Sequence, residues 1–304
     1  MGVMLRGKGK VGEYLYRMML ALQHRGTDSA GVAIYTEGTS SKEEHVLMVQ
    51  IKDVPGAIGE VGNAIGSAGG DIRNIEFRHS PSGGMGLNRY LIRVPNRATL
   101  ERVVGNINAT KVGEVFSYGR SIQVIKDLGV VSNLQIGYNI LGMAGTHGIG
   151  HVRFSTESRV DCRHAHPFHT NVYPDIAVVH NGQITNYHKI RRMLERKGHA
   201  FTSENDTECI VHFIVDLLQR GCSFKGALER SVEELDGPFS YVISTPTAIG
   251  VARDKLGLRP VMLSQDRFGY YIASEECALI SIDKDLKPTY LEPGGVHVYE
   301  REGH

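Results

Sequence analysis

Four short motifs contain residue types that could act together on a small polar substrate. They are Gln23-His24-Arg25-Gly26, Gly150-His151-Val152-Arg153-Phe154-Ser155-Thr156, His180-Asn181-Gly182 and Asn205-Asp206-Thr207-Glu208. A guanidinium group can bind a carboxylate, a carboxylate can pair with an ammonium group, and amide N–H groups can stabilise an oxyanion. Each motif alone is weak, because Asn-Gly is also a common hairpin-turn dipeptide. Their combination favours a catalytic or binding site.

The four motifs, in this order, resemble the glutaminase domain of class II glutamine amidotransferases. These enzymes are N-terminal-nucleophile hydrolases and include amidophosphoribosyltransferase, glucosamine-6-phosphate synthase and glutamate synthase. The family begins with a catalytic cysteine followed by glycine and an apolar residue. In the family mechanism the α-amine of that cysteine takes the thiol proton. This chain begins Met1-Gly2-Val3, so Met1 occupies the place of the nucleophile.

The resemblance implies a role for each matching residue. The side-chain amide of Asn181 and the backbone N–H of Gly182 would bind the oxyanion. Arg153 would hold the glutamine α-carboxylate, and Asp206 would pair with the α-ammonium. Thr156 and His166 match substrate-lining positions, and Arg25 and Asp28 would brace the site. The alternatives are a plain turn at Asn181-Gly182, a surface arginine at the end of a strand, and a helix N-cap at Asp206.

A thioether has no ionisable proton, so a chain with Met1 in the nucleophile's place should not hydrolyse glutamine. One explanation is that the natural chain reads Met-Cys-Gly-Val and that the cysteine was removed, replaced or left out. The other is a degenerate amidotransferase that binds glutamine without hydrolysing it. The first explanation is favoured because the remaining motifs still match the pattern of the family.

Residues 45–118 are predicted to form a separate unit inserted into the first domain. Apolar periodicity and glycine-rich turns indicate the order βαββαβ, which is the ferredoxin-like plan. The segment Lys52–Ile58, followed by Ala68-Gly69-Gly70-Asp71-Ile72, resembles an ACT domain. That resemblance implies a module that binds amino acids at subunit interfaces. We therefore expect an amino-acid effector site or a contact between copies in a homo-oligomer.

The flanking residues 1–44 and 119–300 are predicted to form one glutaminase domain. Strand groups alternate with helices that carry apolar residues at three- and four-residue spacing. The fold class is therefore α+β, and the resemblance implies the αββα sandwich of N-terminal-nucleophile hydrolases. Late segments, Leu258-Arg259-Pro260 and Ala273-Ser274-Glu275, also look like family signatures. Residues 301–304 resemble the remnant of an affinity tag.

Composition narrows the function classes. The formal net charge of +1 gives no electrostatic case for binding nucleic acid or a membrane surface. No apolar run is long enough to span a bilayer. The four cysteines show no CxxC spacing, so we expect reduced thiols and a cytoplasmic protein.

Two further patterns suggest other chemistry. Gly7-Lys8-Gly9-Lys10-Val11-Gly12 is a formal GxGxxG, but no second βα unit follows it, so a mobile loop over the N-terminal site is favoured over a dinucleotide site. His164, His166 and His169 could suggest a metal, but no cysteine or carboxylate completes a recognisable ligand set. We therefore expect neither a metal nor a cofactor.

The sequence contains no motif of an ammonia-accepting synthase. We expect a stand-alone glutaminase subunit whose partner is such a synthase, with a flavin-dependent split glutamate synthase as the first choice. One alternative is a non-catalytic amino-acid sensor that uses the ACT-like unit and a vestigial glutamine pocket. Another is a different N-terminal-nucleophile amide hydrolase, which the pair Arg153 and Asp206 disfavours because together they suit a free α-amino acid.

Overall fold

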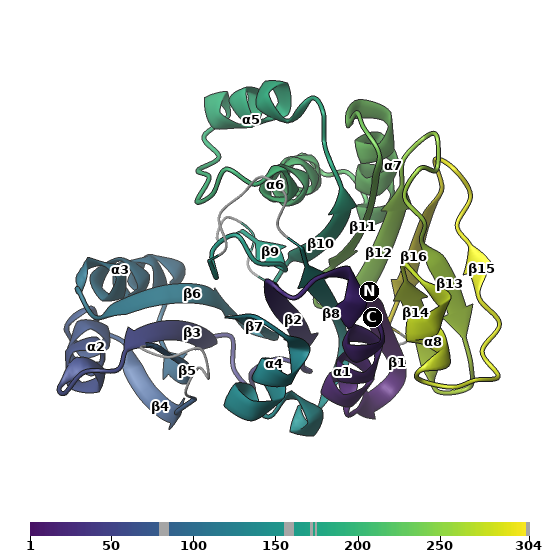
Figure 1. Ribbon diagram of the computed structural model, residues 1–304. Helices are drawn as coiled ribbons and strands as arrows, with labels where there is room; N and C mark the ends of the chain where they lie inside the picture. Colours follow the sequence, from purple (N-terminus) through teal and green to yellow (C-terminus); the bar gives the residue numbers. More distant parts are fainter. Residues whose placement is uncertain (79–84, 155–160, 171–172, 174, 302–304) are drawn as a thin grey trace.

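The computed structural model describes residues 1–78, 85–154, 161–170, 173 and 175–301. Its main body consists of two stacked antiparallel sheets with helices on both outer faces (Figure 1). A third sheet with two helices of its own extends from one side. Within the described residues, no helix is long and apolar enough to cross a membrane. Thr156 lies outside the described residues, as do 302–304 of the predicted tag remnant.

The first sheet has seven strands in the order β15-β13-β14-β1-β8-β2-β7. Their bounds are Thr289–Tyr290 (β15), Met262–Gln265 (β13), Gly269–Ala273 (β14), Gly2–Gly9 (β1), Gly145–Arg153 (β8), Ser29–Tyr35 (β2) and Ile122–Leu128 (β7). Its outer face is covered by α1 (Val11–Ala21), α4 (Val131–Tyr138) and α8 (Glu276–Ile280). Two 3₁₀ turns, η1 (Gln23–Arg25) and η2 (Ile140–Gly142), lie beside α1.

The second sheet has five strands in the order β16-β12-β11-β10-β9. Their bounds are Val296–Glu300 (β16), Ala248–Arg253 (β12), Phe239–Ser244 (β11), Ala177–Gly182 (β10) and Phe168–His169 (β9). The helices α5 (Tyr187–Arg196), α6 (Asp206–Gln219) and α7 (Phe224–Glu234) cover its outer face. Apolar residues of the two sheets meet between them, so the layers are helix, sheet, sheet and helix. This mixed α/β arrangement agrees with the predicted αββα sandwich.

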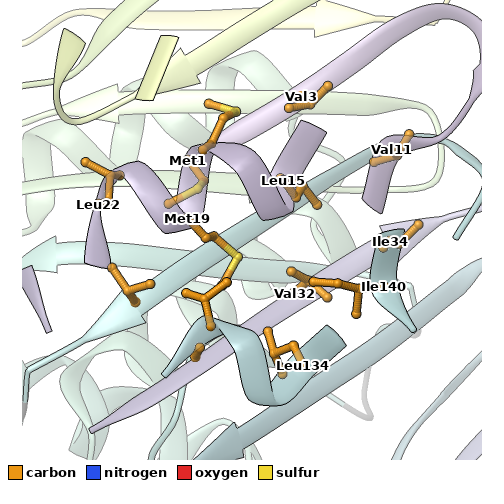
Figure 2. Packing of buried hydrophobic residues seen from close by; sticks show 14 of the residues in the cluster. Met1, Val3, Val11, Leu15, Met19, Leu22, Val32, Ile34, Leu134 and Ile140 are labelled. Carbon is orange, nitrogen blue, oxygen red and sulfur yellow. The ribbon is translucent and has the colours of Figure 1, made fainter. Parts of the chain in front are cut away.

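Alternation along β1 explains how one strand serves two cores. Met1 and Val3 belong to the apolar cluster under α1, whereas Met4 faces the second sheet. Figure 2 shows Met1 and Val3 beside Leu15 and Leu22 of the α1 region. Successive side chains of a strand point to opposite faces, so a central strand must be apolar on both.

The predicted loop at Gly7 to Gly12 is wrong. Residues up to Gly9 continue β1, and α1 begins at Val11. Both neighbours of β1, β8 and β14, are antiparallel to it, so this GxGxxG does not open a parallel βαβ unit. Gly12 has a packing reason instead, because a Cβ there would lie 1.8 Å from the Ile140 carbonyl oxygen.

The third sheet begins and ends next to the predicted limits of 45 and 118. Its elements are β3 (Glu44–Lys52), α2 (Ala57–Ser67), β4 (Asp71–Glu76), β5 (Met85–Arg93), α3 (Arg97–Ala109) and β6 (Gly113–Gly119), in the sheet order β4-β5-β3-β6. The element order is thus the expected βαββαβ. One face packs on α2 and α3, while Val46, Met48 and Leu87 join the cluster under α1 and α4. The assignment of these elements as a separate domain remains a prediction.

Helix α1 offers a matched test of this packing. Leu15 is fully buried in the cluster, whereas Leu20 on the same helix is 43% exposed. We expect Leu15→Ala to lower the free energy of unfolding by about 2–5 kcal/mol, because it removes buried contacts and leaves a cavity. Leu20→Ala should change it by less than about 0.5 kcal/mol. Urea denaturation measures both, and equal effects would show that α1 does not pack as described.

Candidate active site

A cavity of about 1300 Å³ opens where β1, β8 and β10 approach the start of α6. It brings together most of the residues predicted for the site, although they are distant in sequence. Those that line it are Met1, Arg25, Arg153, His166, Asn181, Gly182 and Asp206. Asp28 does not line the cavity but contacts its wall, because its backbone N–H donates to the Arg153 carbonyl at 3.1 Å.

The α-amine of Met1 is buried and donates to the Gly150 carbonyl at 3.0 Å. Burial, with the nearby charge of Arg25, lowers the pKa of this amine to about 5. At neutral pH the amine is therefore mostly uncharged and can accept a proton. The Met1 side chain is 8% exposed and packs in the cluster under α1 (Figure 2).

Two residues at the end of β10, Asn181 and Gly182, line the cavity. Asn181 and Gly182 pair with Ser240 and Phe239 of β11, which fixes their position in the sheet. The Asn181 side-chain nitrogen is buried and makes no hydrogen bond to any part of the chain that the structure describes. Gly182 has φ of 130°, and a Cβ there would lie 2.0 Å from the Pro238 carbonyl oxygen, so only glycine fits.

Asp206 opens α6 but is not its N-cap. The cap is Asn205, whose side chain accepts the Thr207 N–H at 2.9 Å, so the N-cap reading of Asp206 is wrong. One Asp206 carboxylate oxygen accepts the Ile184 N–H at 2.8 Å. The other lies 3.7 Å from His180 Nδ1. Asp206 lines the cavity together with both of these neighbours.

Of the four arginines in the described ranges that line the cavity, Arg25 and Arg153 belong to the predicted site. Arg153, at the end of β8, is 6% exposed, and burial lowers its pKa although the carboxylates of Asp161 and Asp28 oppose the shift. Arg25 forms an ion pair with Glu275. Glu275 also bonds His24 at 3.0 Å, so it holds the predicted bracing segment in place.

Three histidines complete the site, the buried His166 and His180 and the partly buried His151, and only His166 was predicted from the sequence. The His166 Nε2 and His180 Nδ1 atoms each lie 3.0 Å from the Thr207 hydroxyl oxygen, and His166 stacks on His151 at 4.3 Å. Burial lowers the pKa of all three rings, so they are neutral at neutral pH. His151 and His180 lie inside two of the four sequence motifs, and this position could have identified them as site residues.

Four buried side-chain atoms of this site have no hydrogen-bond partner in the described ranges: His151 Nδ1, His166 Nδ1, His180 Nε2 and Asn181 Nδ2. Each such group costs about 1–3 kcal/mol when left unpaired, so their grouping indicates a place for a polar ligand. Arginine and aspartate on the same walls could bind a carboxylate and an ammonium. The described residues contain no group of three or more His, Cys, Asp or Glu placed to hold a metal ion.

Comparison with known proteins agrees with this arrangement. Residues 151–281 match the family described as "Glutamine amidotransferase domain". The chain is 43% identical over 295 residues to the "Putative glutamine amidotransferase" of Methanothermobacter thermautotrophicus, covering 95% of this chain and 94% of that protein. It is 33% identical over 181 residues to the amidophosphoribosyltransferase of Methanocaldococcus jannaschii, covering 58% of this chain and 38% of that protein.

A solved structure supports the fold. The glutamine phosphoribosylpyrophosphate amidotransferase of B. subtilis, in complex with ADP and GMP, superposes with a TM-score of 0.60 at 19% identity. The match covers all of this chain and 50% of that one. At this identity the likeness concerns the fold alone.

The hydrogen bonds of the Thr207 hydroxyl to His166 and His180 can be tested directly. Thr207→Val keeps the shape of the side chain but leaves both ring nitrogens unpaired, so we expect a loss of about 2–4 kcal/mol in unfolding free energy. Thr207→Ser keeps the hydroxyl and should cost less than half of that. Urea denaturation of both variants measures the difference. Equal losses would mean that the hydroxyl does not bridge the rings.

Proposed function

Because the chain belongs to the glutamine amidotransferase family, we propose that its cavity binds L-glutamine as the glutaminase site of an ammonia-supplying subunit. The observation that carries this proposal is the set of four buried, unpartnered polar atoms on walls that also hold Met1, Arg153 and Asp206. A zwitterionic amino acid with a polar side chain matches both the charges and the hydrogen-bonding groups.

The two charged ends of glutamine would be held by residues on different layers. Arg153, on the first sheet, binds the α-carboxylate, and Asp206, on α6, binds the α-ammonium. Burial strengthens both contacts, because charged groups interact more strongly away from water. Arg25 stays on Glu275 and supports the wall without contacting the substrate.

The side-chain amide of glutamine would then lie between residue 1 and the end of β10. With a cysteine at position 1, the neutral α-amine takes the thiol proton while the sulfur bonds to the amide carbon. The side-chain N–H of Asn181 and the backbone N–H of Gly182 stabilise the resulting oxyanion. When the intermediate collapses, the amine returns a proton to the departing nitrogen, which leaves as ammonia. Water hydrolyses the remaining thioester to glutamate.

Met1 supplies no thiol, and its thioether packs in the cluster under α1. We therefore propose that the chain with Met1 binds glutamine without turning it over. This feature also favours the second candidate function, a non-catalytic amino-acid sensor. The two differ in one respect, since a sensor shows no turnover even when the thiol is supplied.

We further propose that the ammonia acceptor is a separate synthase, with a flavin-dependent split glutamate synthase as first choice. The match covers 94% of the relative from M. thermautotrophicus, which leaves little room for an acceptor domain in that relative and supports this proposal. The βαββαβ elements from β3 to β6 would be an ACT-like unit that binds an amino-acid effector or joins copies in a homo-oligomer. Their element order and sheet order support this assignment.

The proposed contact between Arg153 and the glutamine α-carboxylate can be tested separately. Arg153→Lys keeps the charge but loses the planar fork, so glutamine binding should weaken by about 1.5–3 kcal/mol. Isothermal titration calorimetry of the folded variant measures the change. Lys255→Arg, on an exposed loop, serves as the matched control and should bind as the parent does. Unchanged affinity in Arg153→Lys would remove Arg153 from the site.

The chemistry is tested by supplying the thiol. A chain processed to begin with cysteine before Gly2 (Met1→Cys) should hydrolyse glutamine and be labelled once by a glutamine-analogue diazoketone. Adding Asn181→Ala should cut turnover by about 10²–10³ while affinity changes little, because the donor acts on charge that develops in the transition state.

One residue added ahead of that cysteine is the control, since it keeps the thiol but removes the free amine next to it. This extended chain should be inactive. A folded Met1→Cys chain that binds glutamine but neither hydrolyses it nor becomes labelled, with its partner present, would favour the sensor.

A further inference from the structure

The loop between β12 and β13 is held by hydrogen bonds to the side chains of Asp254 and Arg253. The Asp254 carboxylate, only 2% exposed, accepts backbone N–H groups of the loop itself and of β11. The donors are Phe239 at 3.2 Å, Leu256 at 3.0 Å, Leu258 at 3.0 Å and Arg259 at 3.3 Å. One buried side chain therefore sets the path of the whole loop.

Arg253 fixes the same loop from its carbonyl side. Its guanidinium donates to the carbonyl oxygens of Gly257, Arg259 and Leu291. Gly257 has φ of 63°, a conformation that suits glycine, and its N–H bonds the Asp254 carbonyl at 2.9 Å. With donors and acceptors both satisfied internally, the loop has little freedom to rearrange.

This rigid loop presents two leucines to solvent. Leu256 is 76% exposed and Leu258 is 60% exposed. A single exposed apolar residue is ordinary, and Ile136 on α4 is 74% exposed. Here, however, two leucines are held on a preorganised backbone. Burying them against another surface would remove apolar area from water and cost little backbone entropy, which favours association.

The loop is continuous with the cavity. Arg259 and Val261 line the cavity wall. The Ser240 hydroxyl donates to the Pro260 carbonyl at 3.4 Å, and Ser240 lies directly across from Asn181 in the sheet. Phe239, which donates to Asp254, lies across from Gly182. The loop is thus attached to the two β11 residues that face the proposed oxyanion donors.

We propose that Leu256 and Leu258 form the docking surface for the ammonia-accepting synthase chain, an inference that rests on the proposed function. Ammonia released into water at neutral pH becomes ammonium, which is not a nucleophile, so the acceptor must be seated at the cavity. The M. jannaschii relative is matched over 38% of its length, whereas the M. thermautotrophicus relative is matched over 94%. This difference in coverage supports the proposal that the acceptor is a separate protein.

Site-specific photo-crosslinking tests the surface whether or not the chain is active. A benzophenone amino acid replaces Leu256 in the full chain in its source cells, with Ile136 as the matched control position. We expect position 256, and not 136, to cross-link to a chain that makes its product from free ammonium. Cross-linking only to another copy of this chain, to a chain without ammonium-dependent synthesis, to the same chains from both positions, or to nothing would overturn the proposal.

The transfer of ammonia from glutamine to the product is then measured in the complex of that synthase with the Met1→Cys chain. Leu256→Asp with Leu258→Asp should lower glutamine-dependent synthesis about tenfold or more, because the contact would bury two unpaired carboxylates in place of apolar side chains. Ammonium-dependent synthesis and glutamine hydrolysis by the isolated chain should stay unchanged, and Ile136→Asp should change none of the three. Unchanged glutamine-dependent synthesis with the double variant would contradict the proposal. Absence of glutamine hydrolysis by the isolated Met1→Cys chain would contradict the proposed function instead.

Discussion

The site depends on the burial of the chain's first residue in the centre of a sheet. Strand β1 lies between β14 and β8, so the α-amine of Met1 sits among backbone groups and bonds the Gly150 carbonyl. Burial disfavours its charged form, and the amine is a base at neutral pH without help from a carboxylate. The layers around β1 are what keep water from this amine, so the fold itself sets its protonation state.

The second sheet and α6 supply the complementary half of the cavity. The end of β10 presents Asn181, and the first turn of α6 presents Asp206 and Thr207. The histidine rings that connect these elements are neutral for the same reason as the amine. Arg153 and Asp206 are among the charged residues that line the cavity, and they are the pair proposed to select the ligand. The α-carboxylate and α-ammonium of an amino acid fit that pair.

Much of this arrangement could be predicted from local signals. The βαββαβ order followed from periodicity and turn residues, whereas Arg153, Asn181 and Asp206 were named because their motifs resemble a known family. The course of Gly7 to Gly12 was predicted wrongly, because glycine content indicates flexibility while the decisive factor was pairing of β1 with distant strands. The roles of Asn205 as helix cap and of Thr207 as a bridge also depend on tertiary neighbours, which spacing alone does not show.

The central claim is that the cavity is a preformed site for L-glutamine, and nuclear magnetic resonance of ¹⁵N-labelled histidine rings tests it most directly. On titration of the chain with Met1 by L-glutamine, the account predicts saturable shifts of the neutral rings of His151, His166 and His180. D-glutamine, whose α-groups cannot meet both Arg153 and Asp206 in the same pose, should leave them in place. Unchanged resonances of all three rings at saturating L-glutamine would contradict the account.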